Sequence, residues 1–441
     1  MSAAARLISG SLASWAQIAV NMVAQLILVP IYLNYWDVKT YGIWLAILGI
    51  MSALSMLDMG HQNFMAFELL RIGRKDIPAL SKTLFSGIVI GVSISVLQIL
   101  LVIVFFLTGA LAFLLGEAGT NNFELINTAG YALILHAISW LISVTGPGYL
   151  TRGLAPFGYY PRTAWWAFAH AIVVAVTPLV AVTMGADILM ASAALVGAVF
   201  LADVPLYIDL YRLFKRERIR VSKPSLPLAF SNFRMSLPLL GKALLENVRQ
   251  QGVRLLLAPL SGAIGLAAFS TMRTGANVAL QGLNTIVNPI LPDLMRFLHD
   301  RDQQRSEAAF ATIWIVVVAL MAPAVVILQT IIEPLYVFWT QGKISFDPLL
   351  FSLLSLGVLI YAVIQPAMAI VVGNNLTKTQ LMLAAVAAVV LLGVLCLLVP
   401  FIGILGAAIA LLLAEIVAGV GYQIYAEKWL NENDLVWPKR P

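Results

Sequence analysis

SLPLLGKALLENVRQQGVRLLLAPLSGAIGLAAFSTMRTGANVALQGLNTIVNPI, residues 236–290, decides how the rest of the sequence is interpreted. Its composition predicts two long apolar helices joined by a short Pro-Leu-Ser-Gly-Ala turn at 259–263. Five ionisable residues lie inside these helices: Lys242, Glu246, Arg249, Arg254 and Arg273. In a soluble protein they would be unremarkable surface charges, whereas at membrane depth they would mark a functional site.

The composition places the chain in a membrane. Of its 441 residues, 61% are apolar and 11% are charged, whereas soluble domains are about 25% charged. Many segments exceed the roughly 20 apolar residues that a helix needs to cross a bilayer. The single cysteine, Cys396, excludes an intramolecular disulfide. We therefore expect an all-α polytopic membrane protein.

The apolar segments predict about twelve transmembrane helices in two six-helix lobes around a central cleft. The expected organisation is an N-terminal lobe at 1–211, a basic cytoplasmic linker at 212–235, a C-terminal lobe at 236–425 and a cytoplasmic tail at 426–441. The predicted spans are 9–33, 41–66, 80–108, 125–149, 163–184, 188–211, 236–258, 263–290, 309–332, 346–373, 380–399 and 404–425.

The basic residues predict the orientation of these spans. With the N-terminus inside, 21 of the 27 Lys and Arg residues fall on the inner side, two (Lys39 and Lys343) fall in outer loops and four fall within spans. Lys and Arg concentrate on the cytoplasmic side of membrane proteins. Both termini are therefore expected in the cytoplasm. The outer loops are all short, which argues against an extracellular catalytic domain.

The two halves carry a weak internal similarity. Pro30 ends the first span and Pro259 ends the seventh. At this offset, the polar positions of the first span align with polar positions of the seventh, and both sets have a spacing of four residues. Parallel repeats of this kind bind their substrate between the halves. The aligned positions are Gln17, Asn21 and Gln25 against Glu246, Gln250 and Arg254.

Polar residues form stripes along single helix faces in three of these spans. Hydrocarbon disfavours charges by at least about 2.5–3.5 kcal/mol at its centre, so the stripes should face the interior. Polar side chains also join neighbouring helices by hydrogen bonds, and for the first span that alternative is equally well supported. The stripes are Gln17, Asn21 and Gln25; Lys242, Glu246, Arg249 and Arg254; and Arg273, Asn277 and Gln281.

The charge balance of the seventh and eighth spans favours an anionic guest. Four cations face one carboxylate, Glu246, whereas a purely structural network would balance its charges. Arginine is suited to bidentate contact with phosphate or carboxylate. The cations are Lys242, Arg249, Arg254 and Arg273.

Other chemistry is weakly indicated. Glu246 and Asp58 are the candidates for ion coupling, although Asp58, in Leu-Asp-Met-Gly, better fits a role in holding the inner end of the second span. The sequence contains no Gly-rich phosphate loop, metal-spaced His/Cys cluster or nucleophile elbow. We therefore expect no metal, no cofactor, no nucleic-acid partner and no catalytic residue.

Three runs resemble a known family: LVPIYLNYWDVKTYGIWLAILGIMSALSMLDMG (28–60), FSTMRTGANVALQGLNTIVNPILPDLMRFL (269–298) and VPFIGILGAAIALLLAEIVAG (399–419). They are similar to polysaccharide and O-antigen flippases, the Wzx-type members of the multidrug/oligosaccharidyl-lipid/polysaccharide (MOP) exporter superfamily. The resemblance covers most of the chain, because two six-span lobes are the architecture of that superfamily.

The resemblance implies a function. Such flippases move an undecaprenyl-diphosphate-linked oligosaccharide from the cytoplasmic to the periplasmic leaflet of the bacterial inner membrane, for surface polysaccharide or lipopolysaccharide synthesis. It also implies a cationic central cavity and suspected coupling to an ion gradient. The four cations would hold the diphosphate, and Gln17, Asn21, Gln25, Asn277 and Gln281 would contact sugar hydroxyls. Membrane lipids and other polysaccharide-assembly proteins are the remaining expected partners.

Three alternatives stay open. A multidrug or cation antiporter of the same superfamily would share the fold, although four central cations oppose a cationic guest. A membrane-embedded glycan-processing enzyme would require a larger outer loop or a clustered acid and base. A scaffold that recruits glycan enzymes would act through the basic 212–235 segment.

Overall fold

The computed structural model describes residues 3–117, 122–287, 294, 297–298, 302–374 and 376–433. Over these ranges the chain is helical and contains no strand. It divides into two compact units, unit 1 (Met1–Asn247) and unit 2 (Val248–Pro441). The prediction of an all-α protein built from two lobes is confirmed.

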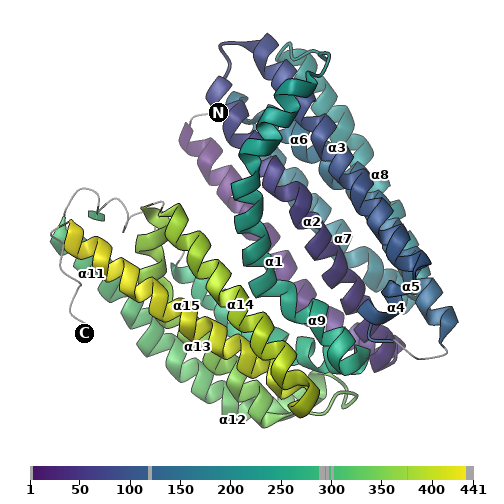
Figure 1. The fold of residues 1–441 in the computed structure, drawn as a ribbon, viewed down its shortest axis with the longest axis vertical. Helices are drawn as coiled ribbons and strands as arrows, with labels where there is room; N and C mark the ends of the chain where they lie inside the picture. Colours follow the sequence, from purple (N-terminus) through teal and green to yellow (C-terminus); the bar gives the residue numbers. More distant parts are fainter. Residues whose placement is uncertain are drawn as a thin grey trace. The chain divides into compact units, whose positions relative to one another are not determined.

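Unit 1 is a bundle of long helices (Figure 1). α1 packs along α7, α7 and α5 pack on α8, and α2 packs against α3, α5 and α6. Its inner core includes Met65, Leu80, Tyr149 and Leu210. The elements are α1 (Ala3–Tyr35), α2 (Val38–Ile72), α3 (Ile77–Leu107), α4 (Ala110–Leu114), α5 (Phe123–Trp140), η1 (Leu141–Thr145), α6 (Gly146–Gly153), η2 (Ala155–Phe157), α7 (Tyr160–Thr183), α8 (Ile188–Arg216) and the first part of α9 (Leu226–Val287).

Aspartates determine where three helices of unit 1 begin. The carboxylate of Asp37 accepts the Thr40 N–H at 2.6 Å, that of Asp76 accepts the Ala79 N–H, and that of Asp187 accepts the Met190 N–H. Each bond satisfies a backbone donor that has no partner within its helix. These caps start α2, α3 and α8 after short connections.

The α9 ribbon consists of two helices joined at Gly262. This glycine has φ 75° and ψ 170°, a conformation outside the helical region that side chains with a Cβ rarely adopt. The predicted turn at 259–263 is therefore confirmed. Predicted spans seven and eight are its two halves.

Unit 2 has its own core. α15 packs on both α13 and α14, as Figure 1 shows for the yellow C-terminal helix. Phe310, Ile313, Ala362 and Ile370 are buried together in this core. Besides the second part of α9, the elements are α11 (Gln303–Ile315), η3 (Val316–Met321), α12 (Ala322–Trp339), α13 (Pro348–Gly373), α14 (Thr377–Ile402) and α15 (Ile404–Glu432).

Among the described residues, ten segments are long and apolar enough to cross a membrane. One of them, Gly252–Asn277, contains the Gly262 turn and so belongs to two helices. The twelve-span layout is consistent with this arrangement. The predicted linker is largely helical, because α8 continues to Arg216 and α9 begins at Leu226.

Candidate functional site

Asp58 is a fully buried carboxylate in the middle of unit 1. Its side chain lies on α2 and is 0% exposed. Gln62 Nε2 donates to Oδ2 at 2.5 Å, Thr145 Oγ1 donates to Oδ2 at 2.8 Å, and the Tyr149 hydroxyl donates to Oδ1 at 3.1 Å. A buried polar group of this kind is costly unless it is hydrogen-bonded. Here three donors satisfy the carboxyl group, and among the residues that the structure describes no basic side chain forms an ion pair with it.

Gln62 connects Asp58 to a basic residue. Its Oε1 accepts from Arg152 Nη1 at 2.6 Å, while its Nε2 donates to Asp58. The same Nη1 donates to the Gly148 carbonyl at 2.8 Å, and Nη2 donates to Asn63 Oδ1 at 3.3 Å. The negative and positive charges are thus joined through one amide. Asp58 and Gln62 are four residues apart on α2, so both face the same neighbour.

A second arm of the network runs to α3. Thr145 Oγ1 lies 2.7 Å from Ser95 Oγ, and both side chains are fully buried. A hydroxyl has one proton, and Thr145 gives its proton to Asp58. Ser95 must therefore be the donor in this pair. While Asp58 is ionised, the hydrogen bonds from α3 through Thr145 all donate toward its carboxylate. We call Asp58, Gln62, Ser95, Thr145, Tyr149 and Arg152 the Asp58 network.

Two glycines make room for this network. A Cβ at Gly91 would lie 2.2 Å from the Tyr149 ring, and a Cβ at Gly148 would lie 2.4 Å from Gln62 Oε1. Cβ atoms do not approach other heavy atoms this closely in proteins. The ring and the amide therefore occupy the positions where side chains of α3 and α6 would otherwise be.

A π-helical turn, η1, presents Thr145 to Asp58. The Gly146 N–H bonds to the Leu141 carbonyl, five residues back. The next bond of this kind would require an N–H at position 147, which is a proline and has none. The Ile142 carbonyl accepts instead from the Tyr207 hydroxyl of α8 at 2.5 Å. Single π-helical turns are frequent at functional sites.

His61 links α2 to the start of α9 within unit 1. Its Nδ1 lies 3.1 Å from Ser236 Oγ, and the ring is fully buried. The Ser236 hydroxyl donates to the Phe233 carbonyl at 2.7 Å. When the Ser236 hydroxyl donates to this carbonyl, the tautomer that fits is the one with the proton on Nδ1. His61 also packs against the Tyr149 ring, so it borders the Asp58 network.

A second buried carboxylate, Asp203 on α8, lies apart from this network. It is 3% exposed, and its Oδ1 lies 3.8 Å from His170 Nδ1 on α7. Its Oδ2 has no hydrogen-bond partner among the residues that the structure describes. This pair lacks the several donors that surround Asp58.

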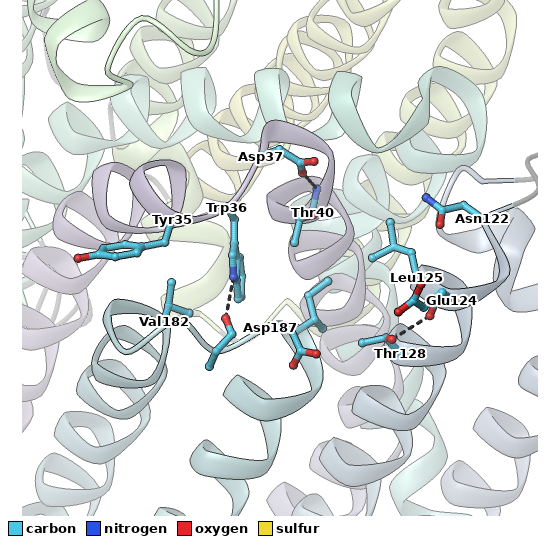
Figure 2. A pocket seen from close by; sticks show the side chains of 13 residues that line it. Tyr35, Trp36, Asp37, Thr40, Asn122, Glu124, Leu125, Thr128, Val182 and Asp187 are labelled. Carbon is cyan, nitrogen blue, oxygen red and sulfur yellow. Dashed lines mark hydrogen bonds between the residues drawn. The ribbon is translucent and has the colours of Figure 1, made fainter.

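The pocket in Figure 2 is a separate feature, at the end of unit 1 where α1 meets α2. Its volume is about 490 Å³, and Trp36 closes one side by donating from Nε1 to the Ala186 carbonyl at 2.9 Å. Asp37 and Asp187 line it, but both carboxylates cap helices. Helix capping therefore explains why aspartate occupies these two positions.

The structure places some of the predicted binding residues and leaves others undescribed. On α1, Gln17 is half-buried, whereas Asn21 and Gln25 are exposed. In unit 2, Arg254, Arg273 and Asn277 are half-buried. The side chains of Lys242, Glu246, Arg249 and Gln281 lie outside the described residues. The predicted binding site therefore remains a prediction.

The sequence interpretation missed most of the Asp58 network. The charge pattern predicts only that Arg152 is one of the 21 basic residues on the inner side, whereas the structure places it part-buried on α6. No motif in the sequence assigns a role to Thr145 or Tyr149. The spacing of the residues is a signal that could have identified them. Thr145 and Tyr149 are four residues apart, and so are Gly148 and Arg152, on either side of the Gly-Pro-Gly sequence at 146–148. Such spacing puts side chains on one helix face.

Comparisons with known proteins identify the fold. No family model and no curated protein sequence matches the chain. Among solved structures, it is similar to the lipid II flippase MurJ in an inward closed conformation, with a TM-score of 0.69 and 15% identity over 95% of this chain and 87% of that one.

MATE transporters are also similar. An inward-facing multidrug resistance MATE transporter of the MOP superfamily has a TM-score of 0.64 and 15% identity, covering 95% of both chains. The Vibrio cholerae MATE transporter VcmN has a TM-score of 0.55 and 16% identity over 97% of this chain and 98% of that one. These solved structures are of MATE transporters and of a lipid II flippase. The protein therefore has the fold that the MATE transporters share with MurJ.

Proposed function

We propose that the protein is a flippase for a polyprenyl-diphosphate-linked oligosaccharide in the bacterial inner membrane. The supporting observation is the likeness to the lipid II flippase MurJ over 95% of the chain, together with the excess of cations in residues 236–290. The Wzx-like runs of sequence narrow the proposal to O-antigen or related surface polysaccharides. Alternating access would move the headgroup across while the polyprenyl tail stays in lipid.

The diphosphate determines the chemistry of the binding residues. Arg254 and Arg273 are half-buried in unit 2, where guanidinium groups can make bidentate contacts with phosphate oxygens. Lys242 and Arg249 complete the proposed anion site. The sugar hydroxyls are proposed to contact Gln17, Asn21, Gln25, Asn277 and Gln281.

The driving force follows from charge. An inside-negative potential favours outward movement of a negative charge by about 2.3 kcal/mol per 100 mV. Two charges on the headgroup would double this contribution. Asp58 and Glu246 are the proposed ion-coupling residues if an ion gradient contributes as well. The Asp58 network supports Asp58, because its hydrogen bonds would rearrange on a change of charge.

A multidrug antiporter is the second candidate function. It is favoured by the MATE likeness, which covers 95% of both chains. In that case Asp58 would be the coupling residue and the guest would be an organic cation. The arginines of unit 2 would then be dispensable for transport.

One complementation experiment separates the candidates. A strain that lacks this gene would receive wild type, the Arg254→Gln/Arg273→Gln double variant, or the Arg71→Gln/Lys428→Gln double variant as a charge-matched control. Arg71 and Lys428 are ion-paired with Glu68 and Glu432, far along the chain from both arginines. Surface glycan, lipid-linked glycan on the cytoplasmic side, and drug susceptibility would be measured, with membrane insertion checked for each variant.

The flippase proposal predicts loss of surface glycan and accumulation of the lipid-linked precursor only in the Arg254/Arg273 variant. Normal glycan export by that variant would contradict the anion site. Normal glycan in the deletion strain, accompanied by drug sensitivity that either variant reverses, would favour the antiporter instead.

A further inference from the structure

Residues 212–223, the C-terminal end of α8 and the first part of its connection to α9, carry an unusual concentration of charge. Six of these twelve residues are basic and one, Glu217, is acidic. The Glu217 carboxylate is occupied by the Tyr159 hydroxyl at 2.5 Å. Among the residues that the structure describes, none of the six forms an ion pair with a carboxylate. We call this the basic segment, and its cations are Arg212, Lys215, Arg216, Arg218, Arg220 and Lys223.

The basic segment is anchored to unit 1. Ile219 is 5% exposed and belongs to the unit 1 core. The Ser225 N–H donates to Ser86 Oγ of α3 at 2.9 Å. Burial and the hydrogen bond to Glu217 raise the pKa of Tyr159, so its hydroxyl remains the donor at neutral pH. These contacts hold the segment in place, unlike a free linker.

The turn that ends α8 contains Arg218 in a backbone conformation that favours glycine. The Ile219 N–H bonds to the Phe214 carbonyl at 3.0 Å, five residues back, as in a Schellman turn. Arg218 occupies the left-handed position of that turn, with φ 59°. Glycine is the usual residue there because it has no Cβ. Arginine at this position adopts an unfavourable backbone conformation and adds a positive charge to the surface.

Large apolar side chains stand beside these cations on the surface. Val221 is 85% exposed, and Tyr211, Leu226 and Phe230 are also exposed. Exposed apolar groups interleaved with Lys and Arg are typical of segments that lie at a membrane surface. The segment comprises the C-terminal end of the apolar helix α8 and the residues that follow it, so it lies at the end of a candidate membrane span.

We propose that the basic segment is a docking surface for the anionic lipid headgroups of the inner leaflet. The guanidinium and ammonium groups would bind lipid phosphates, and Val221 would enter the acyl boundary between them. Each basic residue near such a surface contributes about 1 kcal/mol of attraction, which decays within a Debye length. This interaction is independent of the transported substrate, so it stands whether the protein is a flippase or an antiporter.

The lone cysteine makes the proposal testable with a single probe. In the full-length protein, Cys396→Ser and Val221→Cys would place one environment-sensitive fluorophore at position 221. The labelled protein would be reconstituted in bilayers of phosphatidylcholine alone and in bilayers that also contain phosphatidylglycerol. A shift of the emission to shorter wavelength in the anionic bilayer, reversed by high salt, is the expected result.

Three variants of this labelled protein sharpen the test. Arg218→Gln, Arg220→Gln and Lys223→Gln together should abolish the shift. Arg71→Gln, Arg305→Gln and Lys428→Gln together remove the same charge outside the basic segment, at positions that are ion-paired, and should keep the shift. Arg218→Gly should reduce the shift while the melting temperature stays equal to or above that of the parent, because glycine suits the turn.

Equal emission in both bilayers would overturn the proposal. So would an equal loss of the shift in the charge-matched control, because it would reduce the effect to net charge. Glycine removes the unfavourable backbone conformation at position 218. A reduced emission shift together with an undiminished melting temperature in Arg218→Gly therefore reports the lost charge and not unfolding.

Discussion

Polar residues of unit 1 lie on the consecutive helices α1 and α2 in opposite environments. On α2, Asp58 is completely buried and accepts three hydrogen bonds. On α1, Asn21 and Gln25 are exposed, and α1 packs mainly along α7. Polar residues of these two helices therefore differ in their surroundings. Asp58 on α2 bonds to neighbouring side chains of the unit, whereas Asn21 and Gln25 on α1 lie at the surface, where the proposed function has them contact sugar hydroxyls.

Of the substitutions that test this comparison, removal of the Asp58 carboxylate should have the largest effect on stability. Asp58→Ala leaves Gln62, Thr145 and Tyr149 without their shared acceptor, and each unsatisfied buried group costs about 1–3 kcal/mol. We expect a loss of about 3 kcal/mol or more in the free energy of unfolding, measured by denaturant titration in detergent. Unchanged stability would contradict a structural role for the network.

Asp58→Asn is the matched control for that variant, because it keeps the shape and removes the charge. If its stability stays near wild type while glycan export falls, the charge has a role in coupling beyond packing. If export is also normal, Asp58 only holds the helices together.

A methyl group inside the network should have a smaller effect. Gly91→Ala forces the Tyr149 ring away from α3, and overpacking of this kind costs about 1–3 kcal/mol. Gly197→Ala on α8 is the matched control, because no atom lies within 4 Å of its added Cβ. The melting temperature should fall for Gly91→Ala alone. Equal melting temperatures would show that the ring moves without cost.

The exposed stripe should give the smallest effect on stability. Gln17→Ala with Asn21→Ala should change the free energy of unfolding by no more than about 0.5 kcal/mol, as for most surface substitutions. The same variant should reduce glycan export. Ser11→Ala, on another face of α1, is the control for both measurements. If the α1 double variant is destabilised, the polar residues of α1 also have a structural role, as Asp58 does.

Local sequence signals predicted the helices but not the way in which they meet. Hydropathy located the spans, and Gly262 with its flanking Pro259 located the turn inside α9, because backbone chemistry acts over a few residues. The contact between Gln62 and Arg152 joins positions 90 residues apart. It depends on the glycines that let α2, α3 and α6 approach, which no local pattern reveals.

The candidate site was predictable to a similar degree. The sequence singles out Asp58, as a residue that holds the inner end of the second span or couples transport to an ion, and the structure shows that its carboxylate accepts three hydrogen bonds. It did not identify Thr145, because the π-helical turn changes which side of the helix this residue faces. The anion site of Lys242, Arg249, Arg254 and Arg273 is predicted from charge balance alone, and the complementation experiment tests it.

The π-helical turn at Leu141–Thr145 has a consequence for comparing this chain with its relatives. Such a turn is equivalent to an α-helix with one inserted residue, and one residue corresponds to about 100° of rotation about the helix axis. A relative without the turn would need one codon fewer here to present the same residues to α2. Alignments of this region should therefore carry a gap of one position between residues 141 and 145, and an ungapped alignment would compare side chains from different faces of the helix.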